Sequence, residues 1–196
     1  MSTAEAATTI RSRWAVVTCV GVAQILAWGS SYYLTAVLAG PVAADTGWSM
    51  SWIVGGLSLG LLVSGLVSPR VGWVIDRHGG RPVLVASACL LGTGLLGPGL
   101  ATSLPAFVGA WLVIGLGMGC RLYDPAFSAL ARLYSETARG AITHVTLFGG
   151  FASTVCWPLS AFLVDHAGWR GACFTYAAIH IAVVLPLYAL GLGPCV

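Results

Sequence analysis

An arginine and an aspartate lie three residues apart in an otherwise apolar stretch of the chain. Arg121 and Asp124 fall inside a hydrophobic segment that we predict to run from Pro105 to Leu130. Counted from Pro105 at a helical rise of about 1.5 Å per residue, Arg121 lies only about 5 Å past the middle of a membrane. A charged group at that depth is costly unless it faces protein or water, so a functional role is the default hypothesis.

The three-residue spacing also allows the two side chains to pair on one helix face. In the functional interpretation, Arg121 binds an anionic or polar solute, and Asp124 is its counter-charge or carries a proton. In the structural interpretation, the two charges only neutralise each other. The residues themselves do not decide between these interpretations.

A second set of polar residues lies in the apolar segment from Trp14 to Leu38. Their spacings of three and four residues predict one shared helix face, which either lines a cavity that binds a solute or forms hydrogen bonds between helices. Gly29 is expected to let this helix bend or be closely approached. The members of the set are Gln24, Trp28, Ser31, Tyr32 and Thr35.

The elements that must position these residues are membrane helices. Of the 196 residues, 58% are hydrophobic and 8% are charged, against roughly 25% charged residues in soluble domains. The net charge of +3 is small and scattered, which excludes a nucleic-acid surface. No phosphate loop, nucleotide motif or metal-ligand spacing occurs, so we expect no cofactor and no metal. The six cysteines are interpreted as small buried apolar side chains.

Six segments are long and apolar enough to cross the hydrocarbon, which takes about 20 residues. We therefore predict an all-α polytopic membrane helical bundle with a tail at residues 1–13 and a six-span unit at 14–196. The unit divides into three-helix groups at 14–101 and 102–196. The predicted spans are Trp14 to Leu38, Trp52 to Ile75, Val83 to Ala101, Pro105 to Leu130, Ile142 to Val164, and Ala172 to Leu190.

Arginine placement predicts the orientation, because cytoplasmic loops carry the excess of positive charge. Seven of the nine arginines fall on one side of the predicted spans, so both termini are expected to be cytoplasmic, in the cell (inner) membrane. These seven are Arg11, Arg13, Arg70, Arg77, Arg81, Arg132 and Arg139.

Two polar turns share the pattern D-x-x-G-x-R. They are "DRHGGR" from Asp76 to Arg81 and "DHAGWR" from Asp165 to Arg170, each after the second span of a three-span group. Because three spans is an odd number, the two groups must have opposite orientations across the bilayer. This is the inverted-repeat plan of many secondary transporters.

The first turn also carries a family resemblance. "GWVIDRHGGRPVL" resembles the signature of the major facilitator superfamily between spans two and three, G-x-x-x-D-R-x-G-R-R, with Gly80 in place of one arginine. The resemblance implies a secondary active transporter with spans one and four lining its cavity. It predicts Gln24, Trp28, Ser31, Tyr32, Arg121 and Asp124 as substrate-binding residues. The residues that match the signature are Gly72, Asp76, Arg77, Gly79 and Arg81.

In the turn itself, Gly79 and Gly80 are expected to adopt positive φ and Pro82 to begin the third span. Asp76 lies at a helix C-terminus, where an anion is disfavoured, so we expect a partner in Arg77, Arg81, Arg132 or a second half of the carrier. The functional interpretation is a charge cluster that closes the cytoplasmic side in one conformation. The alternative is a topology anchor made of interfacial arginines.

Members of the family have twelve spans, so the chain resembles an N-terminal half. The predicted function is transport of a small solute, an organic anion or an amphipathic compound, by alternating access. The partners are then lipid and a second six-span half or another copy of the chain. The alternative is a non-transporting or truncated subunit.

An enzyme of the intramembrane serine protease class is disfavoured. Its pair would be Ser128 and His180, which differ too much in predicted depth to touch. A neutral His180 satisfied by a neighbouring helix is expected instead. Small residues at four-residue steps predict close helix contact; these are Gly56, Gly60 and Ser64 in span two, and Gly115 and Gly119 in span four.

Overall fold

Helices account for every regular element in residues 3–121 and 138–191, the two ranges that the computed structural model describes. Two of the elements, η1 and η3, are single π-helical segments inside longer helices. The elements are α1 (Thr3–Trp28), η1 (Gly29–Tyr33), α2 (Leu34–Thr46), α3 (Met50–His78), α4 (Gly80–Leu100), α5 (Leu104–Gly119), α7 (Ala138–Gly150), α8 (Ala152–Ile179), η3 (His180–Val184) and α9 (Leu185–Gly191).

Four helical stretches among the described residues are long and apolar enough to cross a membrane. They are Val16–Thr46, Met50–His78, Gly80–Leu100 and Ile142–Leu190, and the shorter apolar helix Leu104–Gly119 follows the third. The last stretch contains both segments that we predict as spans five and six. Gly168, with φ 71° and ψ 171°, breaks the helical conformation inside α8 between those two segments. The second half of the predicted fourth span lies outside the described residues.

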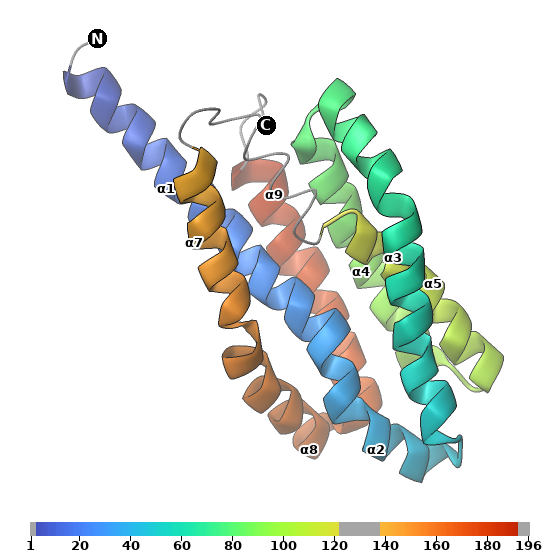
Figure 1. The fold of residues 1–196 in the computed structure, drawn as a ribbon. Helices are drawn as coiled ribbons and strands as arrows, with labels where there is room; N and C mark the ends of the chain where they lie inside the picture. Colours follow the sequence, from blue (N-terminus) through green and yellow to red (C-terminus); the bar gives the residue numbers. More distant parts are fainter. Residues whose placement is uncertain (1–2, 122–137, 192–196) are drawn as a thin grey trace.

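The helices run side by side (Figure 1), with the start of α1, the α3–α4 turn and the end of α9 at one end of the bundle. The α2–α3 turn, the α4–α5 connection and the Gly168 turn lie at the opposite end. Helix α3 packs on α5, α5 on α4, and α4 on α8, while α1 packs on α7. Segments far apart in the sequence therefore meet at the centre, where α1, α4 and α9 adjoin.

Close packing of α3 on α5 confirms the prediction from the small residues. A Cβ atom added at Gly115 would lie 2.5 Å from the carbonyl oxygen of Gly60, and one at Gly119 would lie 3.0 Å from that of Ser64. Only glycine permits backbones to approach this closely. The expectation for Gly29 is confirmed as well, because Cys156 of α8 lies directly against it.

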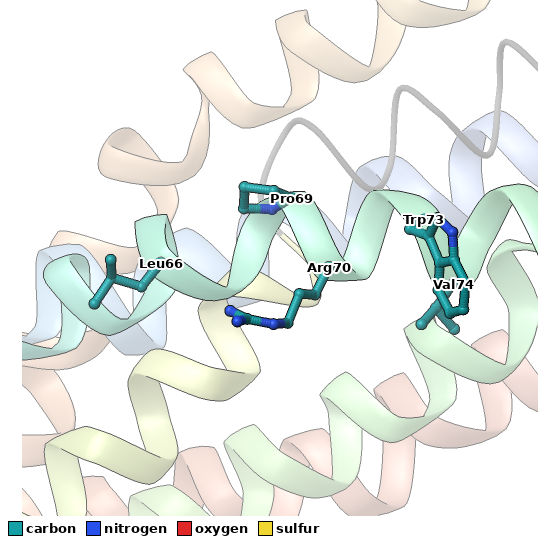
Figure 2. A pocket seen from close by; sticks show the side chains of 5 residues that line it. All are labelled: Leu66, Pro69, Arg70, Trp73 and Val74. Atoms are coloured by element: carbon teal, nitrogen blue, oxygen red, sulfur yellow. The ribbon is translucent and has the colours of Figure 1, made fainter.

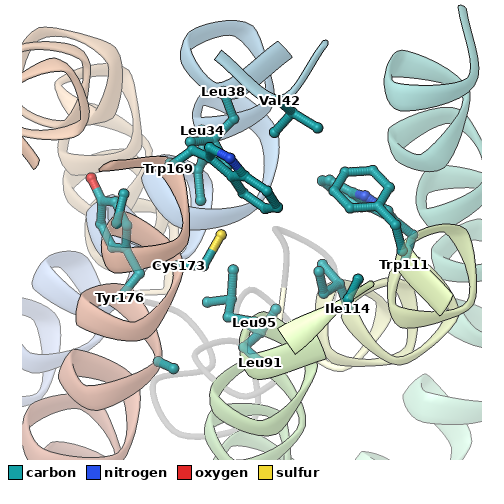
Figure 3. Close-up of a cluster of buried hydrophobic side chains, with 14 of the residues drawn as sticks. Leu34, Leu38, Val42, Leu91, Leu95, Trp111, Ile114, Trp169, Cys173 and Tyr176 are labelled. Atoms are coloured by element: carbon teal, nitrogen blue, oxygen red, sulfur yellow. The ribbon is translucent and has the colours of Figure 1, made fainter. Parts of the chain in front are cut away.

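The largest core cluster fills the end of the bundle near the α2–α3 turn. Figure 3 shows Trp111 of α5 and Trp169 of α8 in this cluster. Leucine side chains of α2 and α4 lie beside them. The space left among these side chains is a cavity of about 10 Å³, roughly one water molecule in size. Trp169 is buried here as a member of this core cluster.

The α3–α4 turn is shorter than the sequence predicts. Gly79 has φ 87° and ψ 166°, as expected for a glycine that leaves a helix. The expectation of positive φ at Gly80 is wrong, because α4 begins at that residue and one non-helical residue suffices to turn the chain. Pro82 lies in the first turn of α4, where its missing N–H is not needed.

Candidate functional site

Arg121 is completely buried directly after the end of α5. Its guanidinium group donates hydrogen bonds to the carbonyl oxygen of Ala23 in α1 and to Nδ1 of His180, at 3.1 Å from Nη1 to Nδ1. The guanidinium carbon lies 5.3 Å from the centre of the Tyr188 ring in α9. Helices α1 and α9 therefore enclose the arginine together with the start of η3.

His180 connects this arginine to the first helix. Nε2 of His180 lies 2.7 Å from the hydroxyl oxygen of Ser30 in η1, and His180 is itself fully buried. The prediction that a neighbouring helix satisfies His180 is confirmed. The bond to Arg121 was not predicted, because no local pattern relates residues 59 positions apart.

Several polar groups around Arg121 have hydrogen-bonding capacity to spare. Among the described residues, nothing accepts from Nε of Arg121, and neither the nitrogen nor the oxygen of the Gln24 side-chain amide has a hydrogen-bond partner. Gln24 adjoins Ala23, whose carbonyl binds the arginine. Buried groups of this kind are costly when unpaired, so the site is suited to a ligand with several acceptor atoms.

No carboxylate of residues 3–121 or 138–191 lies within ion-pair distance of Arg121. Asp45, Asp76 and Asp165 are exposed near helix ends. Asp124, the predicted counter-charge, lies outside the described residues, so its pairing with Arg121 stays a prediction. Across the described part of the chain, no group of three or more metal-ligating side chains comes together.

The polar set on the first helix divides between interior and surface. Gln24, Ser31 and Thr35 are buried, whereas Tyr32 is 40% exposed. Tyr32 departs from the predicted shared face, because it lies in the π-helical segment η1, where the rotation per residue differs from that of a regular α-helix. Tyr32 instead makes an edge contact with Trp28, at 5.8 Å between ring centres.

The hydroxyl groups of the polar set bind within their own helix. Ser31 donates to the carbonyl oxygen of Ala27 at 2.6 Å, and Thr35 donates to that of Ser31 at 3.3 Å. These bonds do not connect one helix to another, and they satisfy carbonyls beside the π-helical segment. The substrate-binding role of Gln24, Trp28, Ser31 and Tyr32 stays a prediction.

The residues of the family signature gather where α3 turns into α4. Asp76 and Arg77 are exposed, and Arg77 stacks on the Trp73 ring at 4.0 Å. Arg81 reaches across to the end of α9 and donates to the carbonyl oxygen of Ala189 at 2.5 Å. An added Cβ at Gly72 would meet nothing within 4 Å. The structure therefore brings Arg81, but not Arg77, against another helix end.

A hollow of about 700 Å³ runs along the last turns of α3 beside this cluster. Figure 2 shows the side chains that line it, all from α3, with the guanidinium group of Arg70 extending along it. Trp73, which carries Arg77 on its ring, belongs to the same lining. The lining residues are Leu66, Pro69, Arg70, Trp73 and Val74.

The second turn, at Asp165–Arg170, forms a network that the sequence did not predict. Arg170 pairs with Asp45 at 2.5 Å and also lies 3.5 Å from the carbonyl oxygen of Ala101 at the end of α4. The indole N–H of Trp169 donates to the same Asp45 carboxylate at 3.0 Å. The D-x-x-G-x-R pattern shared by the two turns was the one feature of the sequence that pointed to Arg170.

Comparison with known proteins gives consistent results. The model of the Major Facilitator Superfamily matches residues 20–194. Monocarboxylate transporter 11 of Mus musculus is 30% identical over 70% of this chain, which covers 29% of that protein. The 3-(3-hydroxy-phenyl)propionate transporter of Escherichia coli is 30% identical over 70% of this chain, covering 32% of that protein. The chain thus matches about a third of the length of these relatives.

Proposed function

The chain belongs to the major facilitator superfamily, a family of membrane transport proteins, and from that premise we propose that it carries a small organic anion by alternating access. The observation that supports this substrate class most directly is the buried guanidinium group of Arg121. No described carboxylate neutralises it, and its own Nε has no hydrogen-bond partner among the described residues. An anion with two oxygen atoms matches the donor geometry of arginine.

The names of the relatives are in agreement with that substrate class. One relative is named for monocarboxylates and another for a phenylpropionate, and both names denote carboxylate anions. In this proposal, Arg121 binds the carboxylate, and Gln24, Trp28, Ser31 and Tyr32 contribute polar and aromatic contacts. Asp124 is proposed as the counter-charge in the empty state.

We propose a six-span unit built from two inverted three-helix repeats, residues 14–101 and 102–196, after a tail at 1–13. Gly79 and Gly168 occupy the same position in the two D-x-x-G-x-R turns, and their backbone angles are nearly identical. The two arginines also have reciprocal partners. Arg81 donates to the end of α9, and Arg170 approaches the end of α4. Reciprocity of this kind is what a two-fold relation between repeats produces.

The transport path needs a second wall, because the chain matches about a third of the length of its relatives. We propose that another six-span half, or a second copy of the chain, supplies that wall in the cell (inner) membrane. Both termini are proposed to be cytoplasmic, on the side of Arg77 and Arg81. The exposed charges of Asp76 and Arg77, together with Gly72, Gly79 and Arg81, are proposed to form the cytoplasmic gate.

Measuring both the binding and the uptake of a solute distinguishes a carrier from a subunit that binds the solute without transporting it. The purified chain is reconstituted in lipid vesicles and supplied with 3-(3-hydroxyphenyl)propionate, with its uncharged amide as the matched ligand. We expect binding and uptake of the anion but not of the amide. Binding without uptake identifies a subunit that needs a partner half, and equal binding of both ligands contradicts the anion site.

The variant Arg121→Lys tests the guanidinium group and keeps the buried charge. Loss of the charged hydrogen bond from the guanidinium group to a carboxylate is expected to weaken anion binding about 10- to 100-fold. Arg139→Lys is the matched control, because Arg139 is exposed on α7. Unchanged anion affinity in Arg121→Lys contradicts the assignment of Arg121.

A further inference from the structure

The contacts of His180 fix which of its ring nitrogens carries the proton. Arginine has only donors, so Nδ1 of His180 must accept the hydrogen bond from Arg121. The proton therefore lies on Nε2, which donates to Ser30. The Ser30 hydroxyl can in turn donate to the carbonyl oxygen of Ala27, 3.4 Å away. The result is a hydrogen-bond chain with one direction, from Arg121 to the backbone of α1.

A second proton on His180 is incompatible with this arrangement. It would have to reside on Nδ1, which faces an N–H group of Arg121 at 3.1 Å. Two donors would then oppose each other, and two positive charges would lie side by side in a buried site. Protonation of His180 is thus possible only if an acceptor with negative charge enters between the two groups.

A carboxylate is such an acceptor, since one of its oxygens can accept from Arg121 and the other from a protonated Nδ1 of His180. We propose that His180 is the proton-binding residue of the carrier, and that it takes up a proton from solution when an organic anion binds at Arg121. This inference rests on the proposed anion site and adds the coupling ion and its residue. By linkage, the proton and the anion each strengthen binding of the other.

Among the residues that the structure describes, the groups around His180 leave this role to the pair of His180 and Arg121, and Asp124 lies outside those residues. Tyr188 of α9 faces the guanidinium group, and Tyr176 of α8 bonds to Ser160 at 2.8 Å. On α4, Arg81 is bound to the carbonyl oxygen of Ala189, and Cys89 is partly buried. Cys156 of α8 lies against Gly29. The three described aspartates are exposed near helix ends, so none of them faces His180.

The position of the pair in the fold connects it to movement of the helices. His180 begins the π-helical segment η3, and Ser30 lies in the π-helical segment η1. π-Helical turns occur frequently at functional sites and mark places where a helix departs from regular geometry. The bond from His180 to Ser30 joins these two segments, and the bond from Arg121 to His180 joins η3 to an arginine that also binds the carbonyl oxygen of Ala23 in α1.

The test is calorimetric titration of the full chain in lipid nanodiscs with 3-(3-hydroxyphenyl)propionate, in buffers of different ionisation enthalpy. We expect uptake of about one proton per anion bound, and an affinity that rises about tenfold for each pH unit of acidification. His180→Asn keeps an oxygen acceptor for Arg121 and should bind the anion without proton uptake. His166→Asn, at an exposed histidine near the Gly168 turn, is the matched control and should behave like the unmodified chain.

¹⁵N NMR of labelled histidine in the unmodified chain provides a second measurement. It does not depend on whether a variant folds. His180 should be neutral with the proton on Nε2 in the absence of anion, and protonated on both nitrogens when the anion is bound. Anion binding without proton uptake overturns the proposal for His180 and leaves the anion site intact. Undiminished proton uptake in His180→Asn assigns the proton to another residue, whereas failure to bind the anion overturns the proposed function itself.

Discussion

The two D-x-x-G-x-R turns have glycines of similar conformation, Gly79 and Gly168, but very different surroundings. At the second turn, Arg170 is paired with Asp45, and Trp169 is buried against the core and bonded to the same carboxylate. At the first turn, Arg81 has a carbonyl partner, while Arg77 stacks on the half-exposed Trp73. The second turn is therefore held within this chain. The first turn presents Asp76 and Arg77 at the surface, as a gate that contacts a second wall requires.

Replacing the tryptophan of each turn by alanine is expected to give the largest difference between the turns, measured as the loss in the free energy of unfolding. Trp169→Ala should lower the free energy of unfolding by about 3–5 kcal/mol, because it removes a large buried ring and leaves a cavity. Trp73→Ala should change it by less than about 0.5 kcal/mol, because 54% of the Trp73 side chain is exposed. Denaturant unfolding in detergent micelles measures both. Equal losses would show that the two turns are equally packed.

The two glycines should have equal effects if the turns are related by a repeat. Alanine at Gly79 or Gly168 must adopt positive φ with extended ψ, a conformation that costs about 1–3 kcal/mol for residues with a side chain. Gly65→Ala is the control, since this position in α3 is helical and an added Cβ meets nothing within 4 Å. Thermal unfolding followed by tryptophan fluorescence measures the losses. A loss at only one of the two glycines would contradict the equivalence of the turns.

Replacing the aspartate of each turn should distinguish an effect on solute uptake from an effect on the free energy of unfolding. Asp76→Asn is expected to reduce solute uptake about tenfold, or about 1.4 kcal/mol, with little change in the free energy of unfolding. Asp165→Asn is the matched control at the second turn and should leave uptake unchanged. Flux into vesicles that contain the chain measures both variants. Equal uptake by the two variants would refute the proposed gating role of the first turn.

The ion pair of the second turn should have the smallest effect. Arg170 and Asp45 are both more than a third exposed, and pairs of this kind contribute little to stability. Asp45→Asn should therefore lower the free energy of unfolding only slightly, and the loss should shrink at 1 M salt because salt screens exposed charges. Unfolding titrations at low and high salt measure this. A larger loss that does not depend on salt would mean that the bond from Trp169 is the main interaction.

Local features of the fold could be predicted from the sequence with some accuracy. Helices α3 and α4 begin and end within three residues of the predicted spans, because hydrophobic length and the Gly79 turn are visible in short windows. Close helix contact at Gly60 and at Gly115 was predicted from residue size, whereas the packing of these two glycines on each other is visible only in the structure. The burial of Arg121 followed from its position in an apolar segment.

The partners of the polar residues could not be predicted in the same way. The bond from Arg121 to His180 and the bond from Trp169 to Asp45 join residues that lie far apart in the chain. The exposure of Tyr32 depends on the rotation of the first helix and on the π-helical segment η1. The merging of two predicted spans into one stretch depends on how sharply the chain turns at Gly168.

The sequence by itself determined the membrane environment, the helical class, the glycine that ends α3 and the presence of a buried cation. These depend on the transfer free energy of side chains and on backbone preferences, which act within a few residues. The tertiary structure alone decided that Arg121 meets His180, that His180 meets Ser30, and that Arg81 and Arg170 have reciprocal partners. Those contacts require specific rotations and tilts of several helices at once, which only the packing of the whole bundle determines.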